Sequence, residues 1–149
     1  MRAVAMALWV LRLAAATAGG EEQAFDYERY RREARELFIV EIEEVKHLRV
    51  EDGENEYEYV YARARVLEVV RTRVGVSPGE YVYIRYIHRY IRPPGSILPA
   101  VEEGAVYTAY LNRILAEDPE AGKLFSGWDH RRQFFPCVEE WSFVERPGR

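Results

Sequence analysis

A run of alternating residue types in the middle of the chain constrains its fold most strongly. Within YEYVYARARVLEVV, residues 57–70, the apolar positions are small or β-branched: Val60, Ala62, Ala64 and Val66. The positions beside them hold Tyr57, Tyr59, Tyr61, Arg63 and Arg65. Because side chains alternate between the two faces of a strand, this period of two predicts a half-buried β-strand. The small residues on its apolar face suit the tight interior of a small barrel.

Two further stretches alternate in the same way. In LFIVEIEEV, residues 37–45, one face carries Phe38, Val40 and Ile42, and the other carries Ile39, Glu41 and Glu43. In a third predicted strand, residues 81–89, the apolar face carries Val82, Ile84 and Tyr86, and the other carries Tyr81, Tyr83 and Arg85. Each strand is therefore predicted to bury one face and expose the other.

Turn residues separate these strands from one another. Asp52-Gly53 and Pro78-Gly79 are turn signals, and Pro93-Pro94-Gly95 ends the third strand because proline cannot donate to a ladder. Ile97 and Leu98 are expected in a loop that packs back on the core. Shorter strands are predicted at residues 106–111 and 140–144. The rest of the C-terminal tail lacks a period and is interpreted as irregular, with a turn at Asp118-Pro119.

The predicted elements together indicate a mainly β chain. Five short strands, a short N-terminal helix and an irregular C-terminal tail are typical of a small five-stranded Greek-key barrel. With 149 residues, 48% of them apolar, the chain supplies one well-buried core. We therefore expect a single barrel domain over residues 37–149.

The first residues are typical of an export signal. Arg2 precedes the apolar residues 3–11, and Ala16-Thr17-Ala18 is a small-x-small cleavage pattern. Arg12 interrupts the apolar run, which leaves it short of the roughly 20 residues of a membrane-spanning helix. We expect residues 1–18 to be a signal peptide and the protein to be secreted or extracytoplasmic, periplasmic in a bacterium. A buried N-terminal helix is the alternative.

Residues 19–36 form a charged N-terminal segment. Its apolar positions predict an amphipathic helix at about Tyr27 to Glu36, with Asp26 as its N-cap. Glu28 with Arg32 and Arg29 with Glu33 have the spacing of helical ion pairs. This helix is expected to cover one end of the domain.

Two stretches resemble a known family. ARVLEVVRTRVGVSPGEYVYIRY, residues 64–86, and LPAVEEGAVYTAYL, residues 98–111, are similar to the netrin-like domains related to tissue inhibitors of metalloproteinases. The resemblance covers about residues 37–111. It implies a barrel of the oligonucleotide/oligosaccharide-binding (OB) type in an exported protein.

The chain departs from that family where the inhibitors act. They chelate the protease zinc through a cysteine at the mature N-terminus, whereas the predicted mature N-terminus here is Gly19-Gly20-Glu21. The only cysteine, Cys137, is close to the C-terminus, where a small buried hydrophobe is its usual role. The inhibitory residues of the family therefore have no counterparts in this chain.

The sequence contains no motif that specifies a reaction. It has no HExxH, CxxC, phosphate-binding loop or GxSxG, and His47, His88 and His130 lack metal-ligand spacing. In Trp128-Asp129-His130 the aspartate could orient the imidazole for catalysis, but adjacent residues seldom face each other. We favour a loop in which Trp128 plugs the barrel end and Asp129 caps backbone amides. We expect no enzyme, catalytic residue, metal site or cofactor.

The candidate binding surface lies on the tyrosine-rich strands. If the second and third strands pair, eight residues share one outer face: Tyr57, Tyr59, Tyr61, Arg63, Arg65, Tyr81, Tyr83 and Arg85. Such a face can stack sugars or bases and contact carboxylates or phosphates. A purely structural interpretation competes with this one. Glu41 and Glu43 have the parity to pair with Arg63 and Arg65 across the sheet.

These observations favour an exported, non-enzymatic binding or interaction module whose partner is a protein or an extracytoplasmic glycan. A protease inhibitor that acts through a loop or edge, and a single-stranded nucleic-acid-binding domain, are the alternatives. The net charge of −4, or −6 once Arg2 and Arg12 leave with the signal, argues against nucleic acid. No membrane span is expected after signal cleavage.

Overall fold

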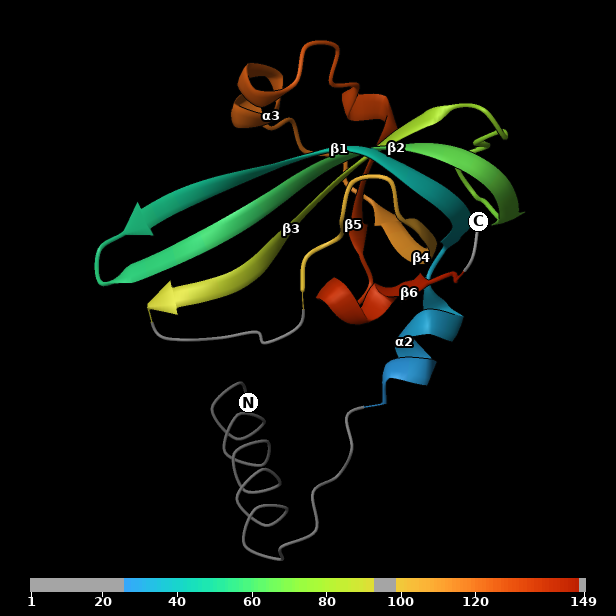
Figure 1. Ribbon diagram of the computed structural model, residues 1–149, viewed down its shortest axis with the longest axis horizontal. Helices are drawn as coiled ribbons and strands as arrows, with labels where there is room; N and C mark the ends of the chain where they lie inside the picture. The colour runs from blue at the N-terminus through green and yellow to red at the C-terminus, as the bar shows by residue number, and fades with distance from the viewer. Residues whose placement is uncertain (1–25, 93–98, 148–149) are drawn as a thin grey trace, which may run out of the picture.

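A computed structural model describes residues 26–92 and 99–147 (Figure 1). Within these residues the fold is mainly β, with six strands in one sheet and two short α-helices. Strand β1 (Glu36–Asp52) and strand β2 (Asn55–Arg71) form a long antiparallel hairpin. Their turn contains Gly53 at φ 62°, a left-handed conformation that favours glycine, as the Asp52-Gly53 signal predicted.

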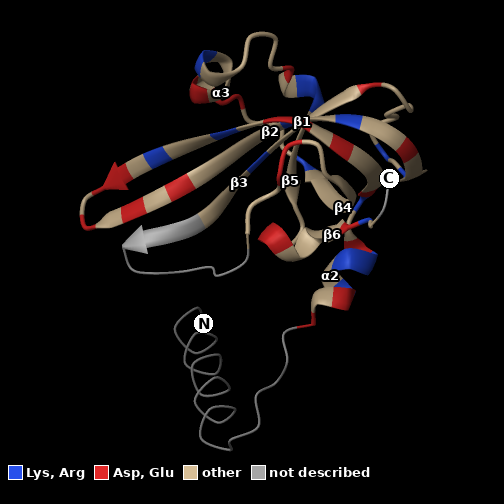
Figure 2. Cartoon of the chain, viewed as in Figure 1, with Lys and Arg blue, Asp and Glu red and all other residues tan. Residues whose placement is uncertain are grey.

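The hairpin extends well beyond the rest of the sheet. Strand β3 (Tyr81–Arg92) pairs antiparallel with β2, which confirms the predicted pairing of the second and third strands. The far halves of β1, β2 and β3 form an arm that projects from the body of the molecule (Figure 1). Figure 2 shows acidic residues at the tip of this arm, where Glu51, Asp52 and Glu54 are exposed.

The remaining strands close the sheet on itself. Strand β4 (Val106–Arg113) pairs antiparallel with the first residues of β1, and strand β5 (Gln133–Pro136) lies between β3 and β4. The β3–β5 pairing is parallel. Strand β6 (Phe143–Glu145) adds to β4. The pairings therefore run as a closed ring through β1, β2, β3, β5 and β4.

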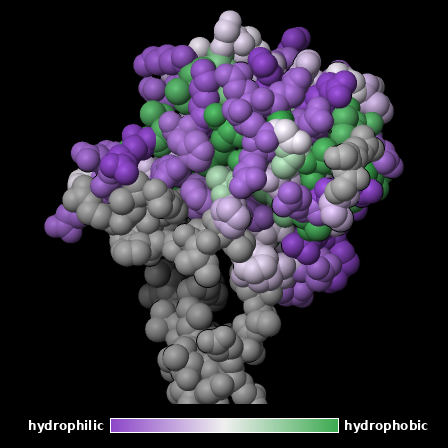
Figure 3. All heavy atoms as spheres, viewed as in Figure 1, coloured by the Kyte–Doolittle hydropathy of each residue, from purple (hydrophilic) through white to green (hydrophobic). Residues whose placement is uncertain are grey.

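The core lies inside this ring, on the faces that the period of two predicted. The apolar faces of β1, β2 and β3 are at most 5% exposed at every predicted core position: Phe38, Val40, Ile42, Val60, Ala62, Ala64, Val66, Val82, Ile84 and Tyr86. Phe134 of β5 meets Phe38 edge-on, with ring centroids 5.8 Å apart. Outside the core, the face of the molecule seen in Figure 3 is mainly hydrophilic, with apolar patches between the charged side chains.

The N-terminal helix is shorter than predicted. Helix α2 spans Tyr27–Glu33, and the Asp26 side chain accepts from the Arg29 amide at 3.0 Å, which confirms the N-cap. Arg29 pairs with Glu33 as predicted, at 3.1 Å. Glu28 pairs instead with Arg31, at 2.9 Å. The helix ends before Glu36 because that residue already belongs to β1 and pairs with β4.

The C-terminal tail is more regular than predicted. Asp118 and Pro119 do not form an isolated turn but start helix α3 (Pro119–Leu124), with Asp118 as N-cap and proline in the first turn. Two 3₁₀ turns, His130–Arg132 and Glu139–Ser142, and strand β5 precede the last strand. The second turn occupies most of the strand predicted at residues 140–144, so β6 begins only at Phe143. The described sheet thus has six strands rather than five. Strand β5 escaped prediction because four residues, QFFP, are too few to establish a period.

Several sequence predictions lie outside the described residues. They are the signal peptide at residues 1–18, the turn Pro93-Pro94-Gly95 and the loop position of Ile97 and Leu98. Among the helices that are described, none has the length and apolar character needed to cross a membrane.

Candidate functional site

The eight predicted binding residues, called here the tyrosine–arginine face, do share one side of the β2–β3 pair. The register sets Arg65 opposite Tyr81, Arg63 opposite Tyr83 and Tyr61 opposite Arg85. Tyr57 and Tyr59 continue this side into the projecting arm, where both are half-buried. The strands therefore bring the predicted residues together, as the parity argument required.

The segment around α3 covers the middle of the tyrosine–arginine face (Figure 1). Tyr61 and Tyr83 are only 3% and 8% exposed, and they form a second core cluster with Phe125 and Trp128. The Trp128 ring centroid lies 5.6 Å from that of Tyr61 and 5.0 Å from that of Tyr83. Burial raises the pKa of both tyrosines. Trp128 therefore packs on the outside of the sheet and does not plug an end of the ring.

A buried aspartate fastens this covering segment to the sheet. The Asp118 carboxylate accepts from the Tyr61 hydroxyl at 2.8 Å and from the Arg85 guanidinium at 2.5 Å. It also caps α3 through the Glu120 amide at 3.0 Å. Burial raises the pKa of Asp118, but the hydrogen bonds from Tyr61 and Arg85 outweigh it and leave the pKa below its ordinary value. Arg85 is thus committed to a structural ion pair.

The open end of the tyrosine–arginine face is neutralised by carboxylates of β1. Arg65 pairs with Glu41 at 3.5 Å, as predicted from parity. Arg63 pairs with Glu44 at 3.4 Å and lies over the Tyr81 ring, 5.6 Å from its centroid. The partner is Glu44 and not Glu43 because β1 has a register irregularity between Ile42 and Glu44, which shifts the parity by one residue.

The residues of the Trp128-Asp129-His130 cluster contact the sheet and neighbouring backbone. Asp129 accepts from the Arg131 amide at 2.9 Å, which confirms that it caps backbone amides. The Arg131 side chain also bonds to Asp129 and lowers the pKa of that carboxylate. His130 Nε2 lies 3.0 Å from the Asp118 amide nitrogen and accepts from it. His130 Nε2 is therefore in contact with backbone atoms of Asp118.

The other two histidines each contact a glutamate. His47 Nδ1 lies 2.6 Å from Glu58, and His88 Nδ1 lies 2.7 Å from Glu140. In the part of the chain that the structure describes, no three His, Cys, Asp or Glu residues are grouped so that they could hold a metal ion.

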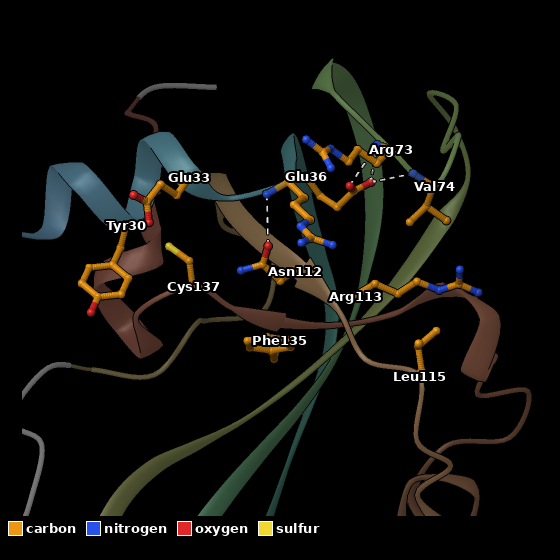
Figure 4. Close-up of a pocket in the computed structure, with 11 residues that line it drawn as sticks. Tyr30, Glu33, Glu36, Arg73, Val74, Asn112, Arg113, Leu115, Phe135 and Cys137 are labelled. Atoms are coloured by element: carbon orange, nitrogen blue, oxygen red, sulfur yellow. Dashed lines mark hydrogen bonds between the residues drawn. The ribbon is translucent and has the colours of Figure 1, made fainter. Parts of the chain in front are cut away.

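A groove of about 610 Å³ lies at the opposite end of the sheet from the arm tip, beside α2 (Figure 4). We call it the arginine groove. Its walls come from α2, the start of β1, the loop after β2, the end of β4, and β5. It is lined by Tyr30, Glu33, Arg35, Glu36, Arg73, Val74, Asn112, Arg113, Leu115, Phe135 and Cys137.

A buried carboxylate shapes one wall of the arginine groove. Glu36 is 1% exposed, and it accepts from the Thr72 hydroxyl at 2.6 Å and from the amides of Arg73 and Val74 (Figure 4). These bonds hold the loop after β2 against β1 and satisfy the buried charge without an arginine. The Arg73 side chain is left to project from a fixed backbone position.

A side-chain amide holds a neighbouring part of the wall. Asn112 Oδ1 accepts from the Arg35 backbone amide at 3.1 Å (Figure 4). With this orientation of the amide, Asn112 Nδ2 remains as a donor in the groove. Asn112 therefore fixes the backbone that carries Arg35 and supplies a neutral donor of its own.

Three arginines of the groove are without acidic partners. The guanidinium groups of Arg35, Arg73 and Arg113 make no ion pair or hydrogen bond with a residue that the structure describes. Of the two glutamates, Glu33 pairs with Arg29 and Glu36 is buried. The same groove has three exposed large hydrophobic side chains, Tyr30 at 42%, Leu115 at 78% and Phe135 at 40%. This combination suits a ligand with both anionic and apolar groups.

Cys137 closes one end of the arginine groove. Its Sγ lies 3.2 Å from the Ser142 hydroxyl, and burial raises the pKa of the thiol. A raised pKa keeps the sulfur protonated at neutral pH, and thiols are weak nucleophiles in that form. Cys137 is thus half-buried and acts as part of the wall.

Sequence reasoning missed the arginine groove. Its residues are scattered from Tyr30 to Cys137, and no spacing connects them before the sheet closes. No family model, curated protein or solved structure matches the chain.

Proposed function

We propose that the protein is an exported, non-enzymatic binding module with an OB-type, netrin-like fold, and that the arginine groove binds an acidic segment of a partner protein. The strand pairing supports the fold. A ring in the order β1-β2-β3-β5-β4, with β3 and β5 parallel, is the strand order of an OB barrel. The inhibitors of that family chelate zinc through an N-terminal cysteine, which has no counterpart in this chain. The proposed binding site is therefore the arginine groove.

One observation carries the binding site. Every arginine of the tyrosine–arginine face has a carboxylate partner, whereas Arg35, Arg73 and Arg113 have none among the described residues. Unpaired, exposed guanidinium groups around a groove give an anionic ligand up to three charge-assisted, bidentate contacts. Exposed apolar side chains between them would be covered by the same ligand.

A protein segment fits this groove better than the other anionic polymers. Leu115 and Phe135 offer aliphatic and aromatic surface that amino-acid side chains can cover. Single-stranded nucleic acid is bound mainly by stacking of bases on aromatic rings, and two of the tyrosines on the OB-type sheet face are buried under α3. Glycan and nucleic acid are therefore outcomes that the experiment must separate.

The experiment is a binding assay with defined anions. Fluorescence anisotropy would be measured with labelled oligoglutamate, an oligogalacturonate and an oligothymidylate. The protein would be compared with a groove variant, Arg35→Gln/Arg73→Gln/Arg113→Gln. A matched control, Arg49→Gln/Arg65→Gln/Arg146→Gln, loses three exposed arginines outside the groove lining and therefore has the same net charge.

We expect oligoglutamate to bind the protein and the control, and the groove variant to lose at least about tenfold in affinity, since each charged contact contributes about 1.5 to 3 kcal/mol. If galacturonate or thymidylate binds more tightly than oligoglutamate at the same groove, the ligand is a glycan or a nucleic acid and not a protein segment. Equal binding by the groove variant, or no binding of any probe, would overturn the proposed function.

A further inference from the structure

A second groove adjoins the arginine groove. It has a volume of about 510 Å³ and shares Arg113, Leu115 and Phe135 with the first. Its other lining residues come from β2, β3 and the segment after β4: Tyr59, Arg85, Tyr86, Ile87, Ile114 and Ala116. Because three residues line both grooves, one ligand can pass from the first into the second across Leu115 and Phe135.

The two grooves differ in chemistry. The second is lined mainly by aliphatic and aromatic side chains, and one of its two arginines, Arg85, is already paired with Asp118. Arg113 therefore stands at the junction, with unpaired charge on one side and apolar surface on the other. Leu115, with 78% of its surface exposed, is a large apolar side chain that nothing among the described residues covers.

From this geometry we infer that the ligand is an extended peptide segment in which acidic residues are followed or preceded by a bulky apolar residue. The acidic part binds Arg35, Arg73 and Arg113. The apolar side chain binds in the second groove, against Leu115 and Phe135. This inference rests on the proposed function. It adds an apolar residue to the acidic ligand and names the side chains of the protein that select that residue.

The distribution of charge favours a peptide over a single-headed amphiphile such as a fatty acid. Arg35 follows α2, Arg73 follows β2 and Arg113 ends β4, so the three groups reach the groove from separate elements. One headgroup carboxylate has two oxygens with which to contact guanidinium groups that come from three separate elements. Several carboxylates along an extended chain can each have a partner, because successive residues are spaced by about 3.3 Å.

The apolar contact also gives a role to two exposed large apolar side chains, Leu115 and Phe135, which line both grooves. Exposed large apolar side chains that adjoin unpaired charge are typical of the centre and rim of a binding surface. Phe135 lies on β5, which is held between β3 and β4, so its ring is presented from a fixed strand. A rigid aromatic side chain of this kind loses little conformational entropy when a ligand covers it.

The test uses four synthetic peptides with blocked termini. The first has a run of glutamates followed by two leucines, and the second has alanines in place of the leucines. The third has glutamines in place of the glutamates. The fourth places the leucines first. Affinities for the full chain would be measured by fluorescence anisotropy at low and high salt.

Two single variants localise the apolar contact. Leu115→Ser removes the exposed side chain at the junction, and Val144→Ser is a matched control, since Val144 is 41% exposed on β6 and lines neither groove. Both positions are exposed, so neither variant should affect folding.

We expect the glutamate–leucine peptide to bind about tenfold more tightly than its alanine counterpart, because a leucine side chain loses its hydration when buried. Leu115→Ser should abolish that advantage and leave the affinity for the alanine peptide unchanged, and Val144→Ser should change neither. The fourth peptide establishes the direction in which the segment lies.

The outcomes separate this inference from the proposed function. If both peptides bind equally and only the arginine substitutions weaken them, the groove binds acidic segments but the apolar half of the inference is wrong. If a fatty acid competes for the site and the peptides do not bind, the ligand class is wrong. If the groove variant binds every peptide as tightly as the parent protein does, both proposals are overturned.

Discussion

The tyrosine–arginine face and the arginine groove are built from similar residues but differ in what surrounds their charges. On the face, Arg63, Arg65 and Arg85 each have a carboxylate within 3.5 Å. In the groove, Arg35, Arg73 and Arg113 have no acidic partner among the described residues. Composition made the face the stronger candidate for a binding site, whereas the contacts favour the groove. Whether an arginine already has a carboxylate partner is therefore more informative than how many arginines a segment contains.

The difference follows from where each region lies on the sheet. The face is on paired strands, and a neighbouring strand places side chains opposite one another at regular spacing. Glutamates of β1 can therefore meet arginines of β2. The groove is formed where the ends of several elements meet. No strand ladder places a carboxylate beside each arginine there.

The largest effect that would test this comparison is loss of the covering segment. Trp128→Ala should destabilise the protein by about 3 kcal/mol or more, because a buried aromatic ring is removed from the second core cluster. Urea unfolding would measure it. The control is Phe135→Ala, at a 40% exposed ring of the groove, which should cost about 1 kcal/mol or less. Similar losses for both variants would remove the distinction between a covered face and an open groove.

The next largest effect concerns the aspartate that fastens α3. Asp118→Asn should cost about 2 kcal/mol at pH 7, since it weakens the bonds from Tyr61 and Arg85 and leaves Arg85 without its charge partner. The folded-state pKa of Asp118 is lowered, so its contribution is present above the pKa of the unfolded chain, about 3.9, and is lost as pH falls through the lower folded value.

Unfolding of the protein and of Asp118→Asn would be compared from pH 7 down to about pH 2.5. The difference between them should shrink below about pH 4. A difference that stays constant over this range would show that the carboxylate charge does not hold the covering segment.

A smaller effect is expected at the open end of the face. Arg65→Gln removes a partner of Glu41 whose side chain is 38% exposed, and exposed ion pairs contribute about 0 to 1 kcal/mol. Thermal unfolding at low and high salt would measure it, and the difference from the parent protein should diminish with salt. A decrease of more than about 2 kcal/mol in the free energy of unfolding would show that this ion pair contributes more than exposed pairs do.

The smallest effect on stability per substituted residue is expected in the groove. Arg35→Gln/Arg73→Gln/Arg113→Gln should change the free energy of unfolding by less than about 0.5 kcal/mol per residue, because no described residue loses a partner. Chemical denaturation would measure it. A marked destabilisation would show that these arginines hold the fold together, and a structural role would then compete with a binding one.

Much of the strand framework could be predicted because it depends on local alternation. Positions such as Val60, Ala62 and Ala64 are buried as their period requires. The irregularity after Ile42, which gives Arg63 a different glutamate, has no local signal. Helix α3 does have a local signal, since Asp118-Pro119 suits the start of a helix as well as a turn.

The candidate site was less accessible to prediction. That Tyr61 and Tyr83 share a face follows from parity, but that Phe125 and Trp128 cover them depends on contacts between distant segments. The groove likewise brings Arg35, Arg73 and Arg113 together only after β1, β2 and β4 have paired. The ligand-binding role of the tyrosine–arginine face stays a prediction for its uncovered residues, Arg65 and Tyr81 among them.

The most direct test of the central claim is to map binding on the amide spectrum of the ¹⁵N-labelled full chain. Titration with the glutamate–leucine peptide should shift the amides around Arg35, Arg73, Arg113 and Leu115. The amides of Tyr61, Tyr83 and Trp128 should stay in place. Shifts around Tyr61, Tyr83 and Trp128, with none around Arg35, Arg73, Arg113 and Leu115, would contradict the account.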